Sequence, residues 1–219
     1  MSTNLSSIQP VVRFLRANRW ARATLSAVSL GLLVAAVGML SYPLYTNYDA
    51  DRRQSRLDRE FASPANRDEY VAGSVAEGDP LTRIKIPAID VDTIVVEGTG
   101  ASALKAGAGH YPTSPLPCED GNVAIAGHRT TYGKPFANID RLAVGDEVIL
   151  QTPIGSCSYE VVHIGPDTAY KIIAPTDFSV VENTPGDPTL TLTSCHPKGS
   201  ARQRIIVQAK LVSQQTEAA

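Results

Sequence analysis

The sequence predicts a mainly β protein, a closed or nearly closed β-barrel with short helical pieces, preceded by one transmembrane helix. Between residues 81 and 213, short apolar and β-branched runs recur at near-regular spacing, separated by turns rich in glycine and proline. Between Ala23 and Tyr48 the chain carries no charged residue. About 20 residues at ~1.5 Å each cross the ~30 Å hydrocarbon core of a bilayer, so this segment is long enough to span one.

The residues before the uncharged segment predict its orientation. Residues 1–22 form a short leader with arginine at positions 13, 16, 19 and 22. The positive-inside bias places this leader in the cytoplasm and the chain after the helix, predicted over residues 23–46, outside the cell. A cleaved signal peptide is the alternative. A retained anchor is favoured, because the apolar segment is longer than a signal core and leaves through Tyr-Pro-Leu-Tyr rather than a clear small-residue cleavage site.

The rest of the chain divides by composition into a linker, one folded domain and a tail. Residues 47–80 are rich in charged and small residues, and we expect an extracellular linker in which residues 50–61 continue as a helix. Residues 81–213 are long enough for one domain with its own core, and residues 214–219 form a polar tail. The 219-residue chain has a formal net charge of −2, which favours neither nucleic acid nor a strongly charged partner.

The expected strands follow one another with few helical interruptions. A short helix is expected over residues 101–106, ended by Gly107. In chain order, strands are expected over residues 81–87, 92–97, 122–127, 147–152, 157–164, 172–175, 178–181, 189–195 and 205–211.

A cysteine at the end of one expected strand is the candidate nucleophile. Thr189 to Thr193 alternates threonine with leucine, Pro197 cannot donate to a strand ladder, and residues 198–200 form a turn. Cys195 therefore lies at a strand end, close to the arginines that enter the return strand. A thiol with a pKa near ~8.5 is only partly ionised at neutral pH, so nearby positive charge raises its thiolate fraction. The alternative is a buried, inert cysteine.

A histidine from another strand end completes such a site. Residues 122–127 form a short apolar strand, and His128 follows it at the start of a polar loop. An imidazole there is suited to protonate a leaving amine and then to deprotonate an incoming one. The other histidines are weaker candidates. His196 is expected on the face opposite its neighbouring cysteine, His163 falls in a strand, and His110 lies in a loop.

These motifs resemble the sortase family of cysteine transpeptidases. Ala-Ile-Ala-Gly-His at residues 124–128, Thr-Leu-Thr-Ser-Cys at 191–195 and an arginine about nine residues later have the family's order and spacing. The Gly-His-Arg-x-Thr-Tyr-Gly loop at 127–133 and the Cys-His-Pro-Lys-x-Ser-Ala-Arg-Gln-Arg run at 195–204 resemble class E sortases of actinobacteria in particular. The resemblance covers roughly residues 81–212. Ser194 departs from it, because the family usually has threonine before the cysteine.

The resemblance implies a fold, a reaction and a set of site residues. The fold is an eight-stranded β-barrel with small helices. In the reaction, Cys195 attacks the Thr–Gly bond of a Leu-Pro-x-Thr-Gly or Leu-Ala-x-Thr-Gly sorting signal, and His128 acts as acid and then base. The family places its arginine directly before the last apolar strand, so Arg204 is favoured over Arg202 as the donor to the oxyanion. Tyr111 and Thr193 are also expected to bind the signal. Tyr132 is the alternative to Tyr111.

The resemblance also implies partners. These are exported proteins with C-terminal sorting signals and an amine acceptor, either a cell-wall precursor similar to lipid II or a pilin lysine. A pilus-polymerising sortase is one alternative, although residues 47–80 lack the Asp-Pro-aromatic plug of such enzymes. A non-enzymatic, membrane-anchored β-barrel binding module with an inert Cys195 is the other.

The remaining cysteines leave one question open. Cys118 and Cys157 either form a disulfide in an oxidising compartment or remain two separate thiols. No metal-ligand spacing of cysteine and histidine and no phosphate-binding glycine loop occurs, so neither a metal nor a cofactor is expected.

Overall fold

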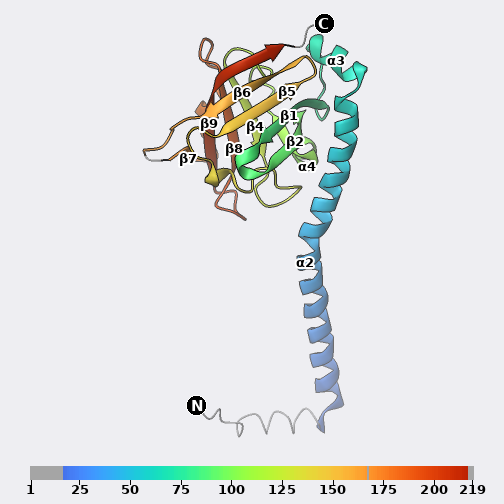
Figure 1. Ribbon diagram of the computed structural model, residues 1–219. Coiled ribbons are helices and arrows are strands. Elements are labelled where there is room, and N and C mark those ends of the chain that lie inside the picture. Colours follow the sequence, from blue (N-terminus) through green and yellow to red (C-terminus); the bar gives the residue numbers. More distant parts are fainter. Residues whose placement is uncertain (1–16, 167, 217–219) are drawn as a thin grey trace. The chain divides into compact units, whose positions relative to one another are not determined.

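The computed structural model describes residues 17–166 and 168–216 (Figure 1). Most of the predicted leader and the end of the predicted tail therefore lie outside the described residues. The chain divides into one unit that ends at Tyr45 and a second, compact unit that begins at Thr46. The long helix α2 (Arg19–Phe61) contributes to both. Its 18-residue apolar window has a mean hydropathy of 2.1 and none of it is buried, so α2 is a candidate membrane span.

Eight strands of the second unit close into a barrel, and a ninth lies beside it (Figure 1). In ring order the eight are β6 (Gly155–Val161), β5 (Glu147–Thr152), β1 (Pro80–Ile86), β2 (Val91–Glu97), β3 (Ala108–His110), β4 (Asn122–Gly127), β8 (Thr189–His196) and β9 (Gln203–Thr216). The ring closes because β6 also pairs with β9 from Ala209 onward. The ninth strand, β7 (Tyr170–Ile173), pairs with the earlier part of β9. The predicted eight-stranded barrel is confirmed.

One short helix precedes the first strand, and four short helical segments connect strands within the described chain. They are α3 (Pro64–Val71), α4 (Ala101–Ala106) and the 3-10 turns η2 (Pro87–Ile89), η3 (Ile139–Arg141) and η4 (Ser179–Val181). The short helix expected over residues 101–106 is confirmed as α4, with Gly107 as its C-terminal cap.

The barrel interior is filled by apolar side chains from facing strands. Ile125 of β4 and Leu192 of β8 are register partners, and both are fully buried. Burial of such a side chain stabilises the fold by about 1.5–3 kcal/mol. All six residues of β4 are buried, which explains why residues 123–126 are continuously apolar rather than alternating. Because β4 and β8 run parallel, their C-terminal ends lie at the same end of the barrel.

The segment predicted as a linker, residues 47–80, is folded against the barrel. The helix expected over residues 50–61 is present as the last part of α2. Its Leu57 packs with Ile94 and Val96 of β2 in a second apolar cluster. Gln54 is bonded to backbone groups of β2 and α4, accepting from the Ile94 N–H at 2.8 Å and donating to the Ala106 carbonyl at 2.7 Å. The segment is thus part of the compact unit, not a spacer beside it.

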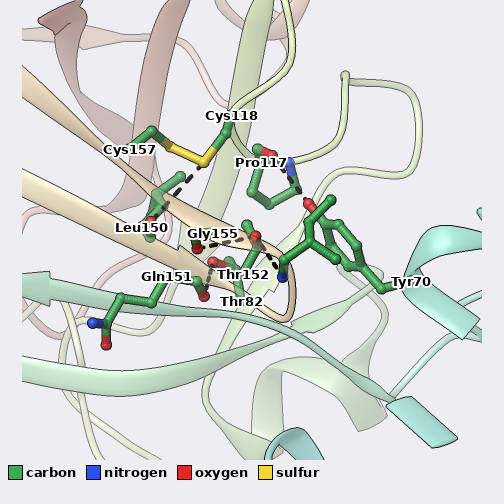
Figure 2. The surroundings of a disulfide bond; sticks show 10 residues. Tyr70, Thr82, Pro117, Cys118, Leu150, Gln151, Thr152, Gly155 and Cys157 are labelled. Carbon is green, nitrogen blue, oxygen red and sulfur yellow. Dashed lines mark hydrogen bonds between the residues drawn. A yellow bond between two sulfur atoms is a disulfide. The ribbon is translucent and has the colours of Figure 1, made fainter. Parts of the chain in front are cut away.

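A disulfide joins Cys118, in the loop between β3 and β4, to Cys157 of β6, 39 residues away in the sequence (Figure 2). The structure therefore decides in favour of the bonded alternative. Close by, the Tyr70 hydroxyl of α3 donates to the carbonyl of Pro117 at 3.0 Å, which ties α3 to the same loop (Figure 2). Burial raises the pKa of Tyr70, so this hydroxyl keeps its proton.

Candidate active site

The last residues of β8 and the first of β9 face each other across an antiparallel ladder. Cys195 is the register partner of Arg204. The connecting turn is closed by a hydrogen bond from the Ser200 N–H to the Pro197 carbonyl at 2.9 Å. Cys195 is half-buried and is the free cysteine of the described chain. The sequence expectation of a cysteine at a strand end next to arginine matches this geometry.

His128 reaches the same end of the barrel from β4. Gly127 is paired with Ser194, and the Ser194 hydroxyl donates to the Gly127 carbonyl at 2.7 Å. His128 and Cys195 are therefore the next residues along two neighbouring parallel strands. A Cβ at position 127 would lie 2.5 Å from the Phe136 ring, so only glycine fits between β4 and this buried aromatic residue.

The imidazole of His128 is half-buried against an aromatic ring. Its centroid lies 5.2 Å from that of Tyr132, with the ring planes tilted by 40°. Burial lowers the pKa of His128 below its ordinary 6.5, because the apolar surroundings disfavour the charged form. The loop that carries Tyr132 has left-handed backbone at Tyr132, Gly133 and Lys134. Part of this unusual conformation is held by Asn47 of α2, whose side-chain oxygen accepts from the Gly133 N–H at 3.3 Å.

The two candidate arginines are distinguished by their surroundings. Arg204 donates to the carbonyls of Ala201 and Gln203, each at 3.0 Å, and lines the cavity beside Cys195. Arg202 is exposed, and its guanidinium donates to the Ser200 hydroxyl in the turn. The geometry therefore favours Arg204 as the arginine of the site.

A cavity of about 270 Å³ gathers these side chains. All five residues expected from the sequence line it: Tyr111, His128, Thr193, Cys195 and Arg204. Its opposite wall comes from the segment between β7 and β8, including Asp177, Phe178 and Val181. Phe178 is 62% exposed, which leaves an aromatic face available to a ligand.

Tyr111 and Thr193 both line this cavity and contact each other. Their hydroxyl oxygens lie 3.1 Å apart, which joins the residue after β3 to β8. Tyr132, the runner-up for signal binding, lines a different cavity of about 400 Å³ together with Ala50, Asp51 and Gln54 of α2. Tyr132 therefore contacts the His128 ring but does not line the cavity beside Cys195.

Comparison with known proteins identifies the family. Residues 84–212 match the Sortase domain, which is more than half of the chain. The chain belongs to the sortase family. Sortases are cysteine transpeptidases, and the barrel with a cysteine and a histidine at adjoining strand ends agrees with that membership.

Among relatives, this sortase is most like class E. It is 26% identical to Sortase SrtE1 of Streptomyces coelicolor over 219 residues, covering 91% of this chain and 61% of that protein. The solved structure of sortase E from Streptomyces avermitilis is 35% identical, with a TM-score of 0.57, and covers 64% of this chain and 93% of that one. Sortase E1 from Streptomyces coelicolor, solved with a tripeptide in its active site, is 29% identical, with a TM-score of 0.57 and coverage of 64% and 94%.

Two other histidines of this sortase, His110 and His163, have different surroundings. His110 is buried, with its Nδ1 2.8 Å from the Glu97 carboxylate and its Nε2 2.8 Å from the Pro115 carbonyl. It therefore holds the β3–β4 loop in place below Tyr111. His163 is exposed and lies after the end of β6, not within a strand as the sequence predicted. The strand ends at Val161, two residues before it, and the chain turns away there.

Two polar residues of the site, Asn122 and Arg129, were not predicted from the sequence. Asn122 donates to the carbonyls of Val180 and Glu182, at 2.9 and 3.0 Å, and so fixes the segment that forms the far wall of the cavity. Arg129 is buried directly after His128 and contacts the backbone of Cys195. Its adjacency to His128 was the available clue. Within residues 17–166 and 168–216, no group of three or more metal-ligating side chains is positioned to hold a metal ion.

Proposed function

We propose that this sortase is a membrane-anchored transpeptidase. It cleaves a Leu-Pro-x-Thr-Gly or Leu-Ala-x-Thr-Gly sorting signal between threonine and glycine and joins the exported protein to an amine of a cell-wall precursor or a pilin. The observation that carries this proposal is the meeting of three strand ends at one cavity. Cys195 is the second-last residue of β8, Arg204 is the second residue of β9 and His128 follows β4, and all three line the same space.

The reaction proceeds through two acyl transfers. The Cys195 thiolate attacks the carbonyl carbon of the signal threonine, and Arg204 donates hydrogen bonds to the oxyanion that forms. The carbon–nitrogen bond then breaks, and His128 gives its proton to the departing glycine amine. In the second transfer the acceptor amine loses a proton to His128 and attacks the thioester carbon. The new amide forms and the Cys195 thiolate leaves, which restores the starting state.

The reaction requires a Cys195 thiolate and a protonated His128. Burial lowers the pKa of His128, so the free imidazole is largely neutral at pH 7. A neutral His128 can accept the proton of the Cys195 thiol, and a peptide that displaces water strengthens the attraction between the thiolate and the imidazolium that result.

The groove next to these residues supports peptide binding. Tyr111 and Thr193 present hydroxyl groups on one side, and Phe178 and Val181 present apolar surface on the other. We assign the side chains of the signal to this space. The apolar window of α2 supports anchoring by one helix with the N-terminus in the cytoplasm, which leaves the barrel outside the cell, where exported substrates and acceptors meet.

The test uses the full chain in detergent micelles with quenched Leu-Pro-x-Thr-Gly and Leu-Ala-x-Thr-Gly peptides and an amine acceptor. We expect cleavage between threonine and glycine, a thioester adduct on Cys195 in intact-mass spectra, and loss of both in Cys195→Ala. The full chain is needed because residues 46–61 pack against the barrel. No cleavage of either peptide by a folded protein whose Cys195 resists alkylation would instead favour the inert binding module.

A further inference from the structure

Arg129 is the buried arginine among the described residues, and its position is unusual for its charge. Only 3% of its side chain is exposed. A buried guanidinium is costly unless charge and hydrogen bonds compensate it, so its partners show what holds it there. It follows His128 directly in the chain, which places a permanent cation beside the proposed acid and base.

The guanidinium joins three parts of the chain that meet at the site. Its Nη2 lies 2.9 Å from the Asp140 carboxylate of η3. Its Nη1 donates to the carbonyl of Cys195 at 3.4 Å and lies 3.1 Å from Nδ1 of His196. Burial alone would raise the pKa of Asp140, but the bond and the charge of Arg129 outweigh it and hold that pKa below the ordinary 3.8. The carboxylate therefore stays charged and compensates the guanidinium.

The contact with His196 orients that imidazole. A guanidinium has five N–H donors and no acceptor. Arg129 is therefore the donor in this contact, and Nδ1 of His196 accepts from it at 3.1 Å. Arg129 thus holds the ring of the residue next to Cys195 as well as the Cys195 carbonyl.

We infer that Arg129 is a positioning residue for the transpeptidase reaction. It ties the main chain of Cys195 and the ring of His196 to the loop of His128, and so holds the proposed nucleophile in place relative to the proposed acid and base. This role rests on the proposed function of Cys195 and His128, although the contacts themselves do not depend on that function. A merely stabilising role for Arg129 is the competing account.

Three variants separate the two accounts. Arg129→Gln removes the cation and most of the donors. Arg129→Lys keeps the charge but loses the planar fork that reaches Asp140 and Cys195 together. The double variant Arg129→Met with Asp140→Leu replaces the buried guanidinium and its partly exposed carboxylate partner with apolar side chains, so that no unpaired charge is left behind. Arg202→Gln, on the exposed arginine of the β8–β9 turn, is the matched control.

The first readout is kinetic. We expect kcat to fall about tenfold or more in Arg129→Gln and in the double variant, since a charge-assisted contact is lost, with a much smaller change in KM. Arg129→Lys should recover part of kcat, and Arg202→Gln should match wild type. An unchanged kcat in a folded double variant, or losses that follow only the folded fraction, would overturn the positioning role.

The second readout needs no peptide cleavage. Cys195 is the one free thiol of the described chain, so alkylation reports on it alone. The rate of Cys195 alkylation should differ from wild type in Arg129→Gln and in the double variant but not in Arg202→Gln, because the main chain of the thiol is no longer held by the guanidinium. If the wild type cleaves no peptide, the proposed function fails. If Cys195 is alkylated at the same rate in the wild type and in the folded double variant, the inference fails, whatever the cleavage result.

Discussion

The hydroxyl groups of Tyr111 and Thr193 share a hydrogen bond of 3.1 Å, and both residues line the cavity beside Cys195. The two residues are 82 positions apart in the sequence, yet both were expected at the signal-binding site. Because Thr193 is also buried two residues before Cys195, the bond connects the groove wall to the strand of the nucleophile.

Tyr111→Phe should therefore weaken peptide binding more than the chemical step. The ring stays in place, but the shared hydrogen bond and one polar group of the groove are lost. We expect KM for the sorting-signal peptide to rise about three- to tenfold, the size of one neutral hydrogen bond, with kcat changed less. Steady-state kinetics with Thr193→Val and the double variant complete a cycle in which the two effects should not add. Additive effects, or an equal loss in Tyr132→Phe, would argue against this assignment.

The lowered pKa of His128 predicts the acid side of the pH dependence. Because burial favours the neutral imidazole, its titration midpoint should lie below 6.5 in the free protein. NMR titration of the folded Cys195→Ala variant measures it without a thiolate nearby. The unfolded chain binds a proton at this position at a higher pH than the folded chain does. Stability should therefore rise with pH through the window just below 6.5, and the part that comes from His128 should be absent in His128→Gln. A midpoint above 6.5 would contradict the burial argument.

The disulfide should stabilise the barrel without entering the chemistry. Cys118 and Cys157 close a loop with a sequence separation of 39, for which chain entropy predicts about 4 kcal/mol of stabilisation. We expect Cys118→Ala with Cys157→Ala to lower the free energy of unfolding by up to about that amount in denaturant titrations. Neither residue lines the catalytic cavity, so kcat of the folded fraction should be retained. A similar loss on adding reductant to the wild type provides the control.

Gly127→Ala should disturb His128 through packing. The added methyl group would lie 2.5 Å from the ring of Phe136, which is fully buried and cannot move aside freely. Overpacking of this kind costs about 1–3 kcal/mol of unfolding free energy. The Phe136 N–H also donates to the His128 carbonyl, so kcat should fall as well. The control is Ala137→Gly, which changes a neighbouring loop position without adding volume. Gly186→Ala cannot serve as the control, because the backbone of Gly186 has a positive φ. Wild-type stability in Gly127→Ala would show that the ring has room to shift.

Leu57→Ala tests whether the last part of α2 belongs to the catalytic unit. Leu57 is 6% exposed and packs against β2, so its truncation should reduce the free energy of unfolding by about 2–3 kcal/mol. Arg59→Ala, on an exposed position of the same helix, should have little effect. Thermal unfolding of the two variants in the same detergent measures the difference. Equal behaviour would mean that residues 46–61 are a spacer, as the composition of the segment had suggested.

The local pattern of the sequence predicted a β-barrel, most of its strands and the cysteine and histidine at two strand ends, but it missed β3 (Ala108–His110). A strand such as β8 can be predicted from the alternation of residue types along it, and a turn from its proline and glycine. Both signals can be read locally, because they depend on conformational preferences of residues that are close together in the chain. Cys195, His128 and Arg204 stand at strand ends next to recognisable motifs, so their order in the sequence was informative. The resemblance to class E sortases extended that information to Tyr111 and Thr193.

Only the tertiary structure decided the contacts that join distant segments. The Arg129 contact with Cys195 spans 66 residues, the disulfide spans 39, and the bond from Gln54 to Ile94 spans 40. His163 lies outside the strand that was predicted for it. The position at which a strand ends depends on the strand it pairs with, not on the composition of the strand itself. Pairings of this kind depend on how the ring of strands closes, and no periodicity within one segment encodes them. The sequence by itself therefore determined the elements and the candidate nucleophile, whereas closure of the barrel determined the surroundings in which that nucleophile works.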